Sequence, residues 1–214
     1  MTLPEVTVVD YDSGNVFGVS RALAHLGGNV NLTGDPDAIA NAERLILPGV
    51  GAFHAAWTLL DDRGLIEPIR AFVATGRPFL GICVGMQLLL EEGTEFGRHP
   101  GFGFVGGAVE RIDDTGADGA PHRVPRVGWY ALRPGPKLRA GSVMARMDDD
   151  DAVYFVHSFA ARPTDEADVA TWSDYNGRTI TAAVERDNVL GVQFHPERSG
   201  ASGLKLLSGF LEQS

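Results

Sequence analysis

The feature that most restricts how this chain can fold is the pentapeptide Gly-Ile-Cys-Val-Gly at residues 81–85. It overlaps the end of an apolar stretch at residues 78–82 and precedes a helical pattern at residues 84–91. A glycine on each side of a reactive residue, between a strand and a helix, is typical of a nucleophile elbow, where a sharp turn exposes the side chain above the edge of a sheet. The pentapeptide therefore predicts a strand, a tight turn that carries Cys83, and a helix.

The first half of the chain alternates between strand and helix patterns. Helices are expected at residues 16–26, 52–60, 65–75 and 84–91, and strands at residues 6–9, 30–32, 44–47 and 78–82. Alternation of this kind predicts crossover connections and a largely parallel sheet with helices on both faces.

The second half of the chain is β-rich. Strands are expected at residues 105–112, 153–159, 169–172, 180–185 and 189–194, with an amphipathic helix only at residues 202–211. The chain has 214 residues, 44% of them hydrophobic, and no long linker divides it. We therefore expect a single α/β domain over residues 1–214.

Charge and composition exclude several classes of partner. Eighteen Lys and Arg against 28 Asp and Glu give a net charge of −10, which repels nucleic acid and anionic lipid. No apolar run approaches the ~20 residues of a membrane helix, and the first residues do not resemble a leader, so a cytoplasmic protein is expected. In a reducing compartment the only cysteine, Cys83, is either buried filler or a nucleophile.

The position of Cys83 in the elbow favours its interpretation as a nucleophile. The free N–H groups at the start of the following helix favour the thiolate, and the Val84 N–H points to where an oxyanion would form. Gln87 lies four residues after Cys83 on the same helical face and is expected to reach a bound substrate. Taken alone, the pentapeptide is equally compatible with a small buried cysteine between close-packed elements.

A second motif supplies a base. Residues 189–194 end in His195-Pro196-Glu197, where the proline restricts the backbone and holds the imidazole near the carboxylate. An imidazole can take the proton of a thiol and later protonate a leaving nitrogen, and a carboxylate fixes its tautomer. An ordinary strand-end turn explains His-Pro-Glu alone, but together with the elbow it predicts a Cys83, His195 and Glu197 triad.

Two further features are less specific. The turn that contains Gly49, Val50 and Gly51 ends another strand and is a candidate second oxyanion donor, although a phosphate-binding turn or a simple tight connection has the same pattern. His157 is either a core histidine or part of a pocket wall. No set of residues has zinc-ligand spacing, so no metal is expected.

With residues 81–87 and 195–197 in this order, the sequence resembles the class I, or triad-type, glutamine amidotransferases over essentially its whole length. This resemblance implies a three-layer α/β/α flavodoxin-like domain that hydrolyses glutamine without a cofactor. It also implies that glutamine and the oxyanion are held by residues of three segments: Gly49, Val50 and Gly51; Val84 and Gln87; His157, Ser158 and Phe159.

Within this family the segments at residues 11–15, 47–53, 154–158 and 191–199 resemble the glutaminase subunits that pass ammonia to the TIM-barrel cyclase of imidazole glycerol phosphate synthase, in histidine biosynthesis. Asn15, Trp129 and Arg198 match positions near that cyclase. Where the family usually has Pro-His-Met-Gly-Trp-Asn, residues 125–130 read Pro-Arg-Val-Gly-Trp-Tyr, and Arg198 replaces the usual Lys. The contacts with the cyclase that the resemblance implies therefore involve residues that differ from the usual ones in this chain.

Two alternatives remain open at this point. The first is an amidotransferase that serves another synthase, such as one that makes anthranilate, guanylate or pyridoxal phosphate. The second is a non-catalytic binding module that has kept the fold, for which the altered Arg126 and Tyr130 are the motivation.

Overall fold

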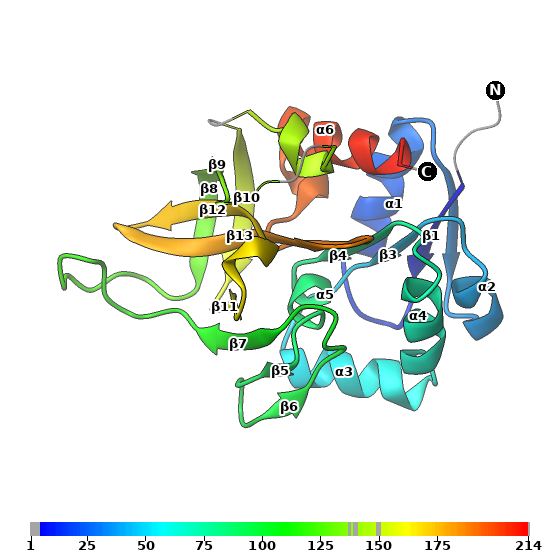
Figure 1. Ribbon diagram of the computed structural model, residues 1–214, viewed down its shortest axis with the longest axis horizontal. Coiled ribbons are helices and arrows are strands. Elements are labelled where there is room, and N and C mark those ends of the chain that lie inside the picture. Colours follow the sequence, from blue (N-terminus) through cyan, green and yellow to red (C-terminus); the bar gives the residue numbers. More distant parts are fainter. Residues whose placement is uncertain (1–4, 137, 139–140, 149–150, 214) are drawn as a thin grey trace.

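A computed structural model describes residues 5–136, 138, 141–148 and 151–213 (Figure 1). Its main feature is an eight-stranded sheet, of which the first five strands in spatial order are parallel. In that order these strands are β2 (Asn29–Thr33), β1 (Glu5–Val9), β3 (Leu45–Leu47), β4 (Phe79–Ile82) and β14 (Val189–Val192).

The sheet continues beyond β14 with antiparallel strands, as the β-rich second half of the sequence requires. These are β13 (Arg178–Arg186), β12 (Val169–Tyr175) and β9 (Arg133–Pro134). The β12 and β13 strands form a long hairpin that extends away from the helices in Figure 1. The parallel part of the sheet therefore carries the helical layers.

Helices cover both faces of the parallel strands, so the predicted three-layer α/β/α architecture is confirmed (Figure 1). On one face α1 (Val16–His25) contacts α6 (Gly200–Leu211). The helices of the other face are α3 (Phe53–Asp62), α4 (Ile66–Val73) and α5 (Val84–Gln87), and α2 (Pro36–Ala40) packs against α4. Each long helix turns an apolar stripe to the sheet, such as Val19 and Leu23 of α1.

Smaller sheets flank the main one. A four-stranded sheet has the order β11 (Phe159–Pro163), β7 (Gly107–Arg111), β5 (Glu92–Gly93) and β6 (His99–Pro100). A ribbon pairs β8 (Arg126–Ala131) with β10 (Ala152–His157). Short 3-10 turns are η1 (Val143–Arg146), η2 (Glu166–Asp168) and η3 (Pro196–Arg198).

Two predicted elements were wrong in extent. The helix expected at residues 84–91 ends at Gln87, because the carbonyls of Leu88, Leu89 and Leu90 accept hydrogen bonds from amides of residues 102–105 instead of continuing a helix. The strand expected at residues 153–159 is divided at Ser158, since β10 pairs with β8 and β11 pairs with β7. The β8 strand itself was not predicted.

The strand order determines where the predicted motifs meet. Because β1, β3, β4 and β14 are parallel neighbours, the loops after them open at the same edge of the sheet. Asn15 follows β1, the turn at residues 49–51 follows β3, Cys83 follows β4 and His195 follows β14.

Candidate active site

The backbone at Cys83 is strained as a nucleophile elbow requires. Cys83 has φ 55° and ψ −109°, in a region that non-glycine residues rarely occupy, and its N–H donates to the Val192 carbonyl at 2.8 Å. The turn also depends on close approach, because a Cβ added to Gly85 would lie 1.9 Å from the Leu47 carbonyl oxygen. A side chain at residue 85 is therefore sterically excluded, and the sulfur is held at the end of β4.

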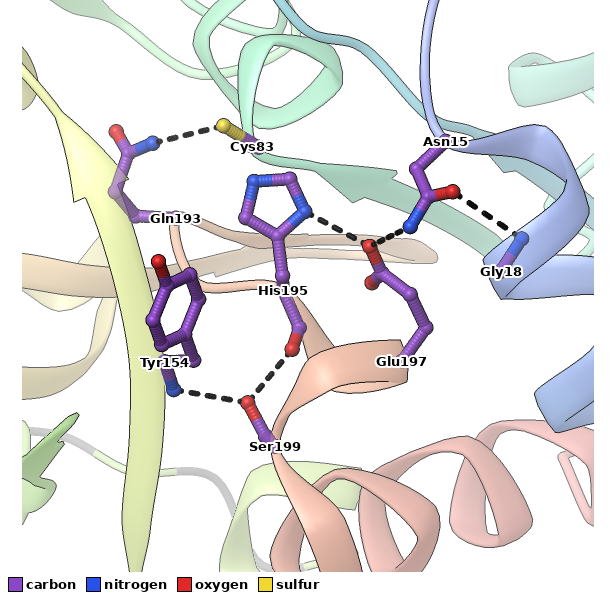
Figure 2. A network of polar contacts seen from close by, with 8 residues as sticks. All are labelled: Asn15, Gly18, Cys83, Tyr154, Gln193, His195, Glu197 and Ser199. Atoms are coloured by element: carbon purple, nitrogen blue, oxygen red, sulfur yellow. Dashed lines mark hydrogen bonds and ion pairs between the residues drawn. The ribbon is translucent and has the colours of Figure 1, made fainter. Parts of the chain in front are cut away.

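His195 and Glu197 form a buried pair beside the sulfur. Nδ1 of His195 lies 2.9 Å from Oε1 of Glu197, and the two side chains are 5% and 1% exposed. Figure 2 shows the imidazole between Glu197 and Cys83, with Nε2 toward the sulfur but without a hydrogen-bond partner among the described residues. The Ser199 hydroxyl donates to the His195 carbonyl at 2.6 Å and accepts from the Tyr154 N–H at 2.9 Å, which fixes the turn to β10.

The environment favours a charged imidazole. Burial by itself lowers the pKa of His195, but the nearby Cys83, the hydrogen bond to Glu197 and the negative charges of both groups raise that pKa to about 10. Burial raises the pKa of Glu197, yet its contacts with His195 and Asn15 outweigh burial and hold that pKa below its usual value. At neutral pH an imidazolium therefore lies between a carboxylate and the cysteine.

Asn15 lies inside this network. Its Nδ2 donates to Oε1 of Glu197 at 3.0 Å, the same oxygen that His195 contacts, while its Oδ1 accepts from the Gly18 N–H at 3.3 Å as the N-cap of α1. The sequence interpretation placed Asn15 near a partner subunit only. The structure adds a contact with the carboxylate of the predicted triad (Figure 2).

A cavity of about 290 Å³ opens at the sulfur and suits a ligand of amino-acid size. Most of the predicted substrate and oxyanion residues line it together with Cys83 and His195, namely Val50, Gly51, Val84, Gln87, His157, Ser158 and Phe159. Glu95 also lines it and was missed in the sequence. The carboxylate of Glu95 accepts from the Phe53 N–H at 3.0 Å through Oε2, which caps α3.

In this conformation the turn after β3 occupies one of the predicted oxyanion donors, the Val84 N–H. The Val84 N–H donates to the Gly49 carbonyl at 3.4 Å, so the carbonyl of Gly49 occupies the direction that the oxyanion prediction gave to a substrate oxygen. Gly51 has φ +90° and Val50 is 42% exposed. The Tyr11 hydroxyl donates to the Pro48 carbonyl at 2.8 Å and anchors the start of the turn.

His157 is a neutral wall of the cavity. Its Nδ1 lies 2.8 Å from the Phe159 carbonyl, and burial, followed by the charges of Arg126 and His195, lowers its pKa to about 3. The Phe159 carbonyl also accepts from Nε2 of Gln87 at 3.1 Å. The Gln87 amide is thus already held by the protein on its nitrogen side.

Sequence reasoning missed Gln193, which contacts the sulfur. Its Nε2 lies 3.7 Å from Sγ of Cys83 and its Oε1 accepts from Nε2 of Gln87 at 3.0 Å. The sequence could have indicated this contact, because side chains alternate along an extended segment and residues 193 and 195 therefore face the same side.

The residues expected near a partner divide into two groups. Trp129 is 54% exposed and its ring lies 6.0 Å from that of Tyr154, over which the Arg198 guanidinium stacks at 4.3 Å. Arg126, in contrast, is fully buried, 4.0 Å from the Tyr130 ring and 4.2 Å from the Phe155 ring. The side chain of Arg126, one of the residues that differ from the usual family segment, therefore points into the protein.

Within the described residues, no three His, Cys, Asp or Glu side chains converge as metal ligands. In the same part of the chain, no helix has the length and apolar character needed to cross a membrane.

Comparison with known proteins agrees with this geometry. Residues 7–213 match the family described as glutamine amidotransferase class-I, and the chain belongs to that family. A chain of the structure of PurLQS from Thermotoga maritima has the same fold, with a TM-score of 0.74, 22% identity and 98% of each chain covered.

Within the family, the chain groups with the HisH subunits of imidazole glycerol phosphate synthase. It is 39% identical over 212 residues to subunit HisH 1 of Legionella pneumophila (strain Lens), covering 98% of this chain and 100% of that relative. The HisH subunit of Salinibacter ruber is 46% identical over 206 residues, covering 95% of this chain and 92% of that relative.

Proposed function

We propose that this chain is the glutaminase subunit of an imidazole glycerol phosphate synthase, and that Cys83, His195 and Glu197 are its catalytic triad. One observation carries the proposal. The strained Cys83 and the buried His195–Glu197 pair meet in a cavity of amino-acid size at the carboxyl ends of β4 and β14. The identity to HisH subunits supports the choice of synthase over one that makes anthranilate, guanylate or pyridoxal phosphate.

The first half-reaction uses the charged imidazole as an acid. The sulfur of Cys83 attacks the carboxamide carbon of glutamine, the C–N bond breaks, and the proton on Nε2 of His195 passes to the departing nitrogen, which leaves as ammonia. Water then attacks the thioester while the now neutral His195 takes its proton. Glutamate leaves, the sulfur regains its electron pair, and the imidazolium is restored.

Stabilising the tetrahedral oxyanion requires the turn at residues 49–51 to move. The Gly49 carbonyl must release the Val84 N–H so that this N–H, with an amide of the turn, faces the oxyanion. Gly49 and Gly51 allow the peptide between them to rotate, since glycine tolerates both signs of φ. We expect the subunit alone to be slow for this reason.

The α-ammonium of glutamine needs an anionic partner in the cavity. Glu95 provides one, because Oε2 is held by the Phe53 N–H while the carboxylate still lines the cavity. The neutral His157 adds no positive charge that would repel the ammonium.

The partner in this proposal is the TIM-barrel cyclase, which receives the ammonia. The exposed Trp129 and Arg198 lie around Tyr154, whose N–H is bonded to Ser199 directly after the triad turn. A subunit that covers Trp129 and Arg198 therefore lies beside His195 and Glu197.

The test is glutamate release from glutamine by the purified chain, alone and with a histidine-pathway cyclase subunit that carries its ribotide ligand. Strong stimulation by the cyclase, lost in Cys83→Ala, is expected. Activity without stimulation would support the glutaminase assignment and contradict the assignment of the cyclase as partner. No activity in either state would contradict the proposed function and support a binding module.

A further inference from the structure

The sulfur of Cys83 needs a source of stabilisation that the helix after it supplies only weakly. The sequence predicts that the N-terminus of a helix over residues 84–91 stabilises the thiolate, but α5 has only four residues. The dipole of so short a helix is small, because the effect comes from aligned peptide units. The Val84 N–H, moreover, donates to the Gly49 carbonyl.

We infer that Gln193 is a positioning residue that donates a side-chain hydrogen bond to the Cys83 thiolate. Its Nε2 lies 3.7 Å from Sγ, within the range of a hydrogen bond to the large sulfur atom, and the whole residue is 0% exposed (Figure 2). The inference rests on the proposed function and adds a residue to the same site.

The neighbours of Gln193 determine which end of its amide faces the sulfur. The Phe159 carbonyl can only accept, so the nitrogen of Gln87 must face it at 3.1 Å. The same nitrogen lies 3.0 Å from the Gln193 amide, which must therefore present its oxygen there. The nitrogen of Gln193 is left for Cys83, because a reversed amide would place two NH₂ groups against each other.

The backbone of Gln193 is fixed as firmly as its side chain. Its N–H donates to the Ala182 carbonyl of β13 at 2.8 Å, directly after β14 ends. Little conformational freedom remains to be lost when the thiolate forms, which is the condition for a preorganised donor.

A neutral amide suits this position better than a second cation. It stabilises negative charge on sulfur without offering a proton that competes with the one on His195, so His195 remains the acid of the first step. It also restricts rotation of the Cys83 side chain, so that the sulfur stays aimed into the cavity.

Alkylation of Cys83 by iodoacetamide as a function of pH tests this inference, and the chain has no other cysteine to confuse the reading. Gln193→Met and Gln193→Leu both remove the donor to sulfur without adding a charge that would itself disfavour the thiolate. Because a hydrogen bond to a charged group changes an ionisation equilibrium by about tenfold, we expect the midpoint of the alkylation profile to rise by about one pH unit in each variant.

Thr181→Val is the matched control, a buried polar residue of the adjacent β13 whose side chain makes no hydrogen bond to the sulfur among the described residues, and it should leave the midpoint unchanged. If Gln193→Met does not fold, Gln193→Leu decides alone. An unchanged midpoint in folded Gln193 variants, with or without a fall in Tm, would overturn the inference. The readout needs no glutamine turnover, so its failure is distinct from failure of the proposed function.

Discussion

The amide of Asn15 donates a 3.0 Å hydrogen bond to the carboxylate of Glu197, although the two residues are 182 positions apart in the sequence. The contact joins the loop after β1 to the loop after β14. It gives the start of α1 a direct connection to the group that orients His195.

This contact can be separated from the capping role of Asn15. Asn15→Ser retains an oxygen for the Gly18 N–H but is too short to donate to Glu197, so kcat for glutamate release should fall roughly tenfold or more. Asn15→Ala should lose as much activity and be about 1 kcal/mol less stable than Asn15→Ser, the usual value of an N-cap. Urea unfolding and glutamate release measure the two effects. Full activity in Asn15→Ser would show that the bond to Glu197 is dispensable.

The elbow predicts a steric limit at Gly85. Gly85→Ala should lower the free energy of unfolding by at least about 2 kcal/mol, because the added Cβ meets the Leu47 carbonyl. Gly76→Ala is the control, with positive φ but nothing within 4 Å of the new Cβ, and should cost about 1 kcal/mol. Urea unfolding compares them, and equal losses would mean that the backbone at residue 85 relaxes freely.

What the sequence could predict follows from the range of the interactions involved. The elbow at Cys83 and the His195–Glu197 turn are local patterns, and parallel strands bring the loops after them to one edge of the sheet. The contacts of Asn15 with Glu197 and of Gln193 with Cys83 depend on the order β1, β3, β4, β14, which no local pattern contains. The burial of Arg126 could not be predicted, because a charged residue is normally exposed, whereas aromatic rings enclose this one.

The cage around Arg126 predicts that lysine cannot replace it. The planar guanidinium stacks between the rings of Tyr130 and Phe155 and donates to Ser173 at 2.6 Å. The ammonium group of lysine is not planar and cannot stack on both rings in this way. We expect Arg126→Lys to lower the free energy of unfolding by about 2 kcal/mol and Arg126→Met, of similar length but uncharged, to cost less. Urea unfolding of both variants checks this order, and the reverse order would argue that charge matters more than shape.

His157 predicts a loss of stability in acid. Its folded-state pKa is lowered to about 3, chiefly by burial, so the unfolded chain takes up a proton near pH 6.5 while the folded chain does not. The unfolded state therefore binds more protons in this range, and stability falls as the pH falls from the unfolded pKa toward about 3. Between pH 6.5 and pH 5 the loss from this residue is about 2 kcal/mol.

His157→Gln isolates this loss from that of other titrating groups, because glutamine fills a similar volume and does not titrate. Urea unfolding at pH 7.5 and pH 5 should show a drop in the native protein that exceeds the drop in His157→Gln by about 2 kcal/mol. Equal drops would mean that His157 is protonated in the folded state at pH 5. A charged imidazole would then line the cavity at that pH, beside the site proposed for an ammonium group.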